Sequence, residues 1–159
     1  MKNKFQIFAE ITKLRITIFV TVTTMFGFIA ATDSIDSQII LPALGILLLA
    51  CGSAALNHYQ ERKTDLLMER TKNRPIPAGK ISAAATLQLS VVLVISGAIL
   101  LFIGSGLFAL SLGLLNLIWY NAVYTPLKKV SALAIIPGSL VGAIPPVVGW
   151  VAGSGNILD

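Results

Sequence analysis

The spacing of the charged residues is the feature that most constrains this chain. Four long stretches of the 159-residue sequence contain no Asp, Glu, Lys or Arg. A helix that crosses the hydrocarbon core of a bilayer needs about 20 predominantly apolar residues. The stretches are therefore predicted to span a membrane; they cover residues 16–32, 37–60, 81–127 and 130–158, which are 17, 24, 47 and 29 residues long.

The third stretch is long enough for two spans, and Gly104, Ser105 and Gly106 near its centre are a turn signal. The predicted fold class is all-α, a polytopic membrane helical bundle of about five transmembrane helices. Pro137, Pro145 and Pro146 are expected to break or kink the last of them. The spans are expected at residues 14–32, 38–57, 82–103, 107–124 and 132–152.

The distribution of charge predicts the orientation. With the N-terminus inside, all twelve Lys and Arg residues fall on one side, whereas the first outside loop carries Asp33 and Asp36 and no base. Short loops rich in Lys and Arg stay in the cytoplasm. The chain is therefore predicted to be a multi-pass protein of the cell inner (cytoplasmic) membrane, with its basic loops facing the cytoplasm.

Composition supports the same class. Hydrophobic residues make up 55% of the chain and charged residues 12%, where a soluble domain carries about 25% charge. The net charge of +5 would also suit nucleic acid, but the bases flank apolar runs, which favours the lipid bilayer as partner and no nucleic acid. No signal peptide is expected, and the single cysteine, Cys51, excludes a disulfide framework within one chain.

The residues able to carry chemistry are concentrated at the end of the second span and in the following loop. Asn57, Glu61 and Asp65 are spaced i, i+4, i+8 and share one face if that span continues as a helix past the interface. Two carboxylates and an amide suit Mg²⁺, a hard cation that shares its ligands with phosphates. Six bases against three acids lie between Glu61 and Lys80. That surplus complements a diphosphate, because arginines make bidentate contacts to phosphate.

Each of these features also has an ordinary explanation. Bases beside a span commonly set topology or contact lipid, and an i, i+4 pair such as Glu61 and Asp65 is often a solvated face. Acidic residues contribute little to orientation, however, so topology does not explain their alignment with Asn57. A lone histidine at a helix end, as at His58, is typically interfacial rather than a metal ligand. Trp119, Tyr120 and Tyr124 are more typical of an aromatic belt than of substrate contacts.

Two segments resemble the motifs of a known superfamily. The first is the Asn57 to Asp65 run followed by Met-Glu-Arg-Thr-Lys-Asn-Arg-Pro-Ile-Pro at residues 68–77. The second is Tyr-Thr-Pro-Leu-Lys-Lys at 124–129, with Gly-Ala-Ile-Pro-Pro-Val-Val-Gly-Trp at 142–150. They resemble the intramembrane aromatic prenyltransferases, and within that superfamily they are most similar to the protohaem IX farnesyltransferase (haem O synthase) family. The resemblance extends over most of the chain.

This resemblance implies a transferase of haem biosynthesis at the inner face of the membrane. It would move the farnesyl group of farnesyl diphosphate to protohaem IX, with Mg²⁺ as cofactor, giving haem O for terminal oxidases. By motif position, Asn57, Glu61 and Asp65 are the catalytic residues and hold Mg²⁺ through the diphosphate. The diphosphate oxygens would be bound by the basic residues Arg62, Arg70, Arg74 and Lys128.

The chain departs from the family pattern in two respects. Members commonly have Asp where this chain has Glu61, and often another Asp where it has Lys63. They are also longer and carry a second aspartate-rich loop that faces the first. Residues 1–159 are therefore interpreted as the N-terminal part of one transmembrane prenyltransferase domain, which holds half of the metal–diphosphate site and is inactive alone.

Three alternatives stay open. The chain is a prenyltransferase for a quinone precursor or a lipid, or it is a non-catalytic membrane protein such as a transporter fragment or an assembly subunit. In the third alternative two copies self-associate to complete a site, because unpaired helix faces in a half-bundle seek partners. Neither the haem-binding residues nor the residue that activates water is indicated by the sequence.

Overall fold

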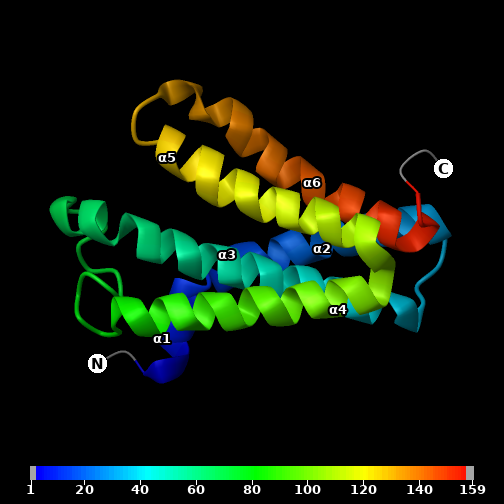
Figure 1. Ribbon diagram of the computed structural model, residues 1–159, viewed down its shortest axis with the longest axis horizontal. Coiled ribbons are helices and arrows are strands. Elements are labelled where there is room, and N and C mark those ends of the chain that lie inside the picture. The colour runs from blue at the N-terminus through cyan, green and yellow to red at the C-terminus, as the bar shows by residue number, and fades with distance from the viewer. Residues whose placement is uncertain (1–2, 157–159) are drawn as a thin grey trace.

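The computed structural model describes residues 3–156, and within that range the chain is built from helices and connecting loops, without strands. The predicted all-α fold is confirmed. The four long helices are α2 (Leu14–Thr32), α3 (Ile40–Leu67), α4 (Ala83–Ile118) and α6 (Ile135–Ser154) (Figure 1). The shorter elements are α1 (Lys4–Ile11), the 3₁₀ turns η1 (Ser37–Ile39) and η3 (Ala132–Ala134), the π-helix η2 (Trp119–Tyr124) and α5 (Thr125–Leu127).

Helix α4 turns back on itself at Gly106. Together with η2 and α5 it forms a 45-residue apolar segment, and a straight helix of that length would measure about 68 Å against a hydrocarbon core of about 30 Å. Gly106 has φ 76° and ψ −173°, a conformation essentially restricted to glycine. The later part of α4 returns toward α5 (Figure 1), so Leu101 packs against Gly113. The turn predicted within the third uncharged stretch is therefore present.

Four helices of the described chain are long and apolar enough to cross a membrane. Because the third is doubled back at Gly106, these four account for the five predicted spans. Their outer surface carries large apolar side chains, such as Phe19 and Phe26, which are 72% and 67% exposed, while Thr17 and Thr24 are buried. An apolar exterior over a partly polar interior is the arrangement that lipid favours.

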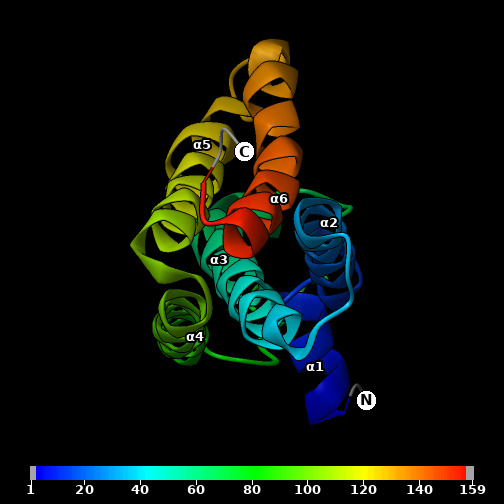
Figure 2. The ribbon, with the colours of Figure 1, turned by 90° about the vertical axis from the view of Figure 1, so that its right-hand side faces the viewer.

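Small residues bring the helices close together. Gly97 of α4 lies against α3, where a Cβ at position 97 would sit 2.8 Å from the carbonyl oxygen of Gly45. Gly149 of α6 faces α2 so closely that a Cβ would overlap the carbonyl oxygen of Thr24. Close backbone approach is the usual basis of helix packing in membranes. Viewed end-on, α3 lies at the centre of the bundle, with α2 and α4 on either side (Figure 2).

Three local features differ from the sequence-based expectations. Helix α3 continues to Leu67, well beyond the predicted span end at residue 57, and so carries the acidic motif on regular helix. The short helix α1 was not anticipated. Of the break or kink predicted at Pro137, Pro145 and Pro146, the break is absent, because α6 runs through all three prolines. The close packing of Pro146 against Gly27 of α2 supports the helix where backbone hydrogen bonds are lost.

Candidate functional site

The second half of α3 presents three polar side chains to the protein interior. Asn57 is 0% exposed, Glu61 6% and Asp65 3%. Their i, i+4, i+8 spacing places them on one helical face, and the shared partners described below confirm that alignment. Buried carboxylates are retained in proteins only when they are paired and hydrogen-bonded, so the partners define the site.

Arg74 pairs with both carboxylates. Its Nη1 lies 2.9 Å and 2.8 Å from the two oxygens of Asp65 and 3.5 Å from Oε2 of Glu61. Arg74 reaches back from the loop after α3, which is anchored where the buried Thr71 hydroxyl donates to the carbonyl oxygen of Asp65 at 3.1 Å. Arg74, which was predicted as a diphosphate ligand, therefore lies at the acidic motif.

Lys128 approaches Glu61 from the opposite side of the site. Its Nζ lies 3.0 Å from Oε1 of Glu61 and 5.3 Å from the ring centroid of Tyr124. Lys128 directly follows α5, more than sixty residues after the acidic motif. The two resemblance motifs, which are far apart in the sequence, thus meet at Glu61.

Lys13 contributes a third cation. Its Nζ donates to Oδ1 of Asn57 at 2.8 Å and to the hydroxyl of Tyr120 at 3.0 Å. Burial lowers the pKa of Lys13, and the nearby positive charge of Arg74 lowers it further. The residue lies between α1 and α2 with φ 50° and ψ 45°, a left-handed conformation that residues other than glycine seldom adopt. Such strain concentrates at functional sites.

A chain of hydrogen bonds closes a ring around Asn57. Its Nδ2 donates to the Thr125 hydroxyl at 3.0 Å, and that hydroxyl donates to the carbonyl oxygen of Tyr120 at 2.9 Å. Lys13 joins the Tyr120 hydroxyl back to Asn57. Tyr120 belongs to the π-helix η2, and such insertions are frequent at functional sites. The ring holds α3, η2, α5 and the start of α2 in fixed relative positions.

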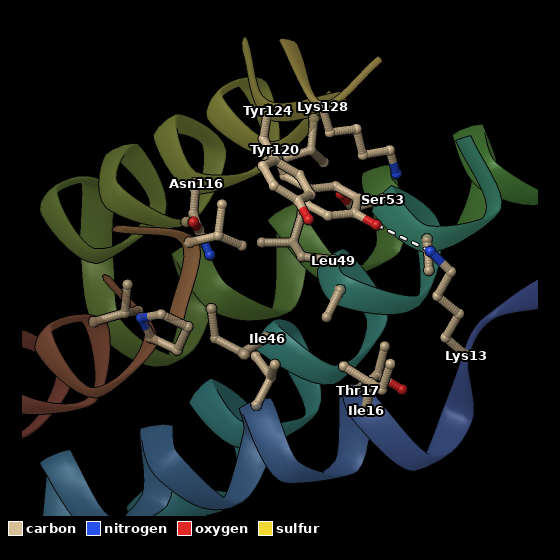
Figure 3. A pocket seen from close by; sticks show the side chains of 18 residues that line it. Lys13, Ile16, Thr17, Ile46, Leu49, Ser53, Asn116, Tyr120, Tyr124 and Lys128 are labelled. Carbon is tan, nitrogen blue, oxygen red and sulfur yellow. Dashed lines mark hydrogen bonds between the residues drawn. The ribbon is translucent and has the colours of Figure 1, made fainter. Parts of the chain in front are cut away.

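A cavity of about 330 Å³ opens beside this cluster (Figure 3). Lys13, Lys128, Tyr120 and Tyr124 gather at one part of it, and the two tyrosine rings stack with centroids 5.7 Å apart. The remaining wall is mostly apolar and comes from α2, α3, α4 and α6, including Ile16, Val20, Ile46, Leu49, Leu117 and Val148. The volume lies in the range of small-molecule sites, about 300–1,000 Å³.

The charges of the cluster leave a positive surplus. Lys13, Arg74 and Lys128 face two carboxylates, Glu61 and Asp65. A ligand that brings negative charge to this end and an apolar tail into the cavity would complement both features. Isoprenyl diphosphates have that construction.

Two predicted diphosphate ligands lie outside the cluster. The guanidinium of Arg62 stacks over the ring of Tyr59, 4.0 Å from the centroid, and donates to the Tyr59 carbonyl oxygen at 2.6 Å, because position 62 lies on a different face of α3 from Asn57. Arg70 is exposed in the loop. The structure therefore brings together Asn57, Glu61, Asp65, Arg74 and Lys128 from the predicted set, but neither Arg62 nor Arg70.

Other residues of the cluster were missed or interpreted differently. Lys13 was assigned only to topology, Tyr120 and Tyr124 to an aromatic belt, and Thr125 was given no role of its own. Sequence spacing offers no signal for Lys13, because its contacts are with residues 44 and 107 positions away. Within the described residues, no group of three His, Cys, Asp or Glu side chains is gathered as a metal site.

Residues 19–159 match the UbiA prenyltransferase family. The chain belongs to this family. The match covers most of its length and confirms the superfamily suggested by the two motifs.

Its relatives in the UbiA family include several proteins named protohaem IX farnesyltransferase. The chain is 36% identical to the one from Cytophaga hutchinsonii over 158 residues, covering 98% of this chain and 55% of the relative. It is 37% identical to the one from Christiangramia forsetii, covering 94% and 50%, and 36% identical to the human mitochondrial protein, covering 95% and 34%. The chain thus spans about half the length of the bacterial relatives and a third of the human one.

A solved structure of digeranylgeranylglyceryl phosphate synthase in membranes has a similar fold. The TM-score is 0.85 at 19% identity, and the match covers 94% of this chain and 53% of that protein. At this identity the likeness concerns the fold alone. It supports the arrangement of the helices described above.

Proposed function

We propose that this chain forms the prenyl-diphosphate-binding part of a protohaem IX farnesyltransferase, which transfers a farnesyl group to protohaem IX to give haem O. One observation carries the proposal: the cation cluster on Glu61 and Asp65 lies beside an apolar cavity of about 330 Å³. Lys13, Arg74 and Lys128 would bind the diphosphate oxygens. The isoprenoid chain would occupy the cavity between α2, α3, α4 and α6.

The side-chain oxygens of Asn57, Glu61 and Asp65 suit Mg²⁺ only when a diphosphate is bound as well. Carboxylate and amide oxygens are ligands that Mg²⁺ takes in proteins, but those of Asn57, Glu61 and Asp65 are all engaged by basic side chains. A diphosphate would draw the basic groups to itself and free these oxygens. Mg²⁺ bound there would help to neutralise the departing diphosphate.

The residues themselves would act on the leaving group and on the reacting carbon. Fixed cations near the C1–O bond of the prenyl diphosphate stabilise the charge that develops as this bond breaks and the diphosphate takes the electron pair. The vinyl π electrons of the acceptor form the new bond to C1. A water oxygen then adds to the other vinyl carbon and releases one proton. The aromatic faces of Tyr120 and Tyr124 lie at this end of the cavity, where they would face the developing cation.

We also propose that the site faces the cytoplasm at the inner membrane. Lys13, Arg74 and Lys128 come from three different connections, all predicted to be cytoplasmic, and they meet at one end of the bundle. Labelling with a membrane-impermeant thiol reagent would test this orientation. Cysteine at position 72 should react only from the cytoplasmic face and cysteine at position 36 only from the opposite face, while the buried native Cys51 gives little background. Reaction at position 72 from the opposite face alone would contradict the orientation.

The length of the relatives supports a further part of the proposal. Because the bacterial relatives are about twice as long, the remaining half of their domain would supply the second acidic loop. Residues 1–159 would then bind the prenyl diphosphate without transferring its prenyl group. Conversion of farnesyl diphosphate and protohaem to haem O by the purified chain would refute this.

Donor binding provides the direct test of the proposed site. The purified chain in lipid nanodiscs should bind a non-hydrolysable farnesyl diphosphate analogue in the presence of Mg²⁺. Arg74→Ala should weaken binding at least about tenfold, since it removes a partly buried cation from the site. Arg70→Ala is the matched control, because Arg70 lies in the same loop but is exposed, and it should leave binding within about twofold. Equal effects of the two substitutions would argue against the site.

A further inference from the structure

The apolar cavity ends deep in the bundle, on a floor of packed side chains. Its lining follows α3 past Leu49 to Ile46, away from Lys128 (Figure 3). Val148 is the last lining residue on α6. Ile46 and Val148 are 5% and 0% exposed, and they belong to one cluster of buried apolar residues with Leu49, Leu101, Ala109 and Val151. These side chains close the deep end of the cavity.

Gly113 of α4 leaves room at this floor. A Cβ at position 113 would lie 2.8 Å from Cδ2 of Leu101 and 3.2 Å from Cδ1 of Leu49. Cδ1 of Ile46 would be 3.7 Å away. Of the α4 residues that line the cavity, Gly113 is also the farthest along the chain from Tyr120. Three apolar side chains thus converge where Gly113 has none, and a larger residue there would take space from a ligand.

The depth of the cavity matches one length of prenyl chain. Ile46 and Asn57 lie about 16 Å apart along α3 at about 1.5 Å per residue. Asn57 marks the level of the cations, because its Oδ1 accepts from Lys13. An extended carbon chain advances about 1.2 Å per bond, so a farnesyl main chain covers about 13 Å and a geranylgeranyl main chain about 18 Å. A chain that starts at the cations would therefore reach the floor as farnesyl and overrun it as geranylgeranyl.

We propose that Ile46, Gly113 and Val148 determine prenyl-chain length, with farnesyl as the longest chain that the cavity holds. The inference rests on the proposed function, which puts the diphosphate at the cations. A geranyl chain would leave part of the apolar wall uncovered and lose the free energy of that burial. A geranylgeranyl chain would have to fold back or displace packed side chains, because protein interiors leave few voids.

Binding of donor analogues of different length provides the first test. Non-hydrolysable analogues of geranyl, farnesyl and geranylgeranyl diphosphate would be titrated against the chain in lipid nanodiscs with Mg²⁺. The farnesyl analogue should bind at least about tenfold more tightly than either of the others. Equal binding of the farnesyl and geranylgeranyl analogues would overturn the length limit, because the longer tail would then leave the cavity freely. Failure of the farnesyl analogue to bind would instead overturn the donor site on which the limit depends.

A substitution that deepens the floor should extend the limit. Ile46→Ala should raise the affinity for the geranylgeranyl analogue relative to the farnesyl analogue at least about fivefold. Leu44→Ala is the matched control, because Leu44 is 43% exposed on the same helix and lies outside the cavity lining. It should change this ratio less than about twofold. Both affinities are measured on the same protein, so a general loss of folded chain leaves their ratio unchanged.

A substitution that fills the floor should act in the reverse sense. The methyl group of Gly113→Ala should raise the affinity for the geranyl analogue relative to the farnesyl analogue at least about threefold. Gly142→Ala is the control, because open space surrounds Gly142 on α6 and it lies outside the cavity lining. Unchanged ratios in both Ile46→Ala and Gly113→Ala would show that other residues end the prenyl chain, and would overturn the assignment.

Discussion

The first half of α3, from Ile40 to Ser53, buries apolar and small side chains, whereas the second half, from Asn57 to Asp65, buries an amide, an imidazole and two carboxylates. In the first half the backbone of α4 packs directly against the helix. Dispersion forces between closely fitting surfaces are enough to stabilise this contact. In the second half the amide of Asn57 and the carboxylates of Glu61 and Asp65 are paired with side chains from other segments. Equal burial along one helix thus serves packing at one end and ligand binding at the other.

The largest loss of stability is expected from disturbing the first half of α3, where the helix packs against α4. A Cβ at Gly97 would lie 2.6 Å from the backbone nitrogen of Leu49, so Gly97→Leu forces the backbones of α3 and α4 apart. Overpacking of this kind costs about 1–3 kcal/mol or more, and thermal unfolding in detergent should occur at a much lower temperature. Gly142→Leu is the control, because open space surrounds Gly142. Similar unfolding temperatures for the two variants would show that the α3–α4 contact does not stabilise the bundle.

The charged half should respond next, and by a different mechanism. Arg74→Ala leaves the Asp65 carboxylate buried without its basic partner, which should destabilise the chain by about 1–2 kcal/mol, because Arg74 is itself partly exposed to solvent. Adding Asp65→Asn should recover part of that loss, because the uncompensated charge is removed. Unfolding free energies of the two single variants and the double variant measure this coupling. Strict additivity would mean that the 2.8 Å contact contributes nothing.

The effect of pH on binding of the farnesyl diphosphate analogue should be smaller, and it should identify Lys13 as the titrating group. The pKa of Lys13 is lowered by burial and by Arg74. An exposed lysine has a pKa of about 10.4, so Lys13 loses its proton at a lower pH than an exposed lysine does. Anion binding needs the protonated form, so analogue binding should weaken as the pH rises through the lowered pKa. The unfolded chain binds the proton more tightly, so this group makes the folded state more stable as pH rises between the two pKa values.

Lys13→Arg separates this effect from general alkaline inactivation. Arginine stays charged across the range, so analogue binding by this variant should persist to higher pH than binding by the unmodified chain. Binding isotherms at several pH values would make the comparison. Identical pH profiles for the two proteins would show that Lys13 is not the titrating group.

The smallest effect is expected from Tyr120→Phe. This change removes the hydroxyl that accepts from Lys13 at 3.0 Å and keeps the aromatic ring at the cavity. One lost hydrogen bond to a charged group corresponds to about 1–3 kcal/mol, with the lower end expected because Lys13 retains Asn57. Analogue affinity should fall by about five- to tenfold. A fall as large as that of Arg74→Ala would make Tyr120 a principal ligand.

Regular, periodic features of the fold were predictable from the sequence. The uncharged stretches located the spans, Gly106 marked the reversal in α4, and helical spacing aligned Asn57 with Glu61 and Asp65. Each of these depends on local geometry. Lys13 could not be placed in the same way, because its role depends on contacts across the whole bundle.

Arg62 and Arg70 show the converse difficulty. Both belong to the basic segment that predicts phosphate binding, but Arg62 is drawn onto the ring of Tyr59, three residues earlier, and Arg70 faces away from the cluster into the surroundings. Charge counting identifies a basic segment without telling which members turn inward. Tertiary geometry distinguishes Arg74 from Arg62 and Arg70, because the loop returns the Arg74 guanidinium to the carboxylates of α3.

The hydrogen-bonded ring around Asn57 has a consequence for biosynthesis. Hydrogen-bonded pairs within it are separated by up to 107 positions in the chain, so a ribosome delivers Asn57 to the bilayer well before Tyr120 and Thr125 are made. In lipid, amide and carboxylate groups without partners are costly. We therefore expect water, lipid headgroups or the insertion machinery to solvate the polar half of α3 until the later helices arrive, so that this half reaches its final environment only after η2 and α5 have been made.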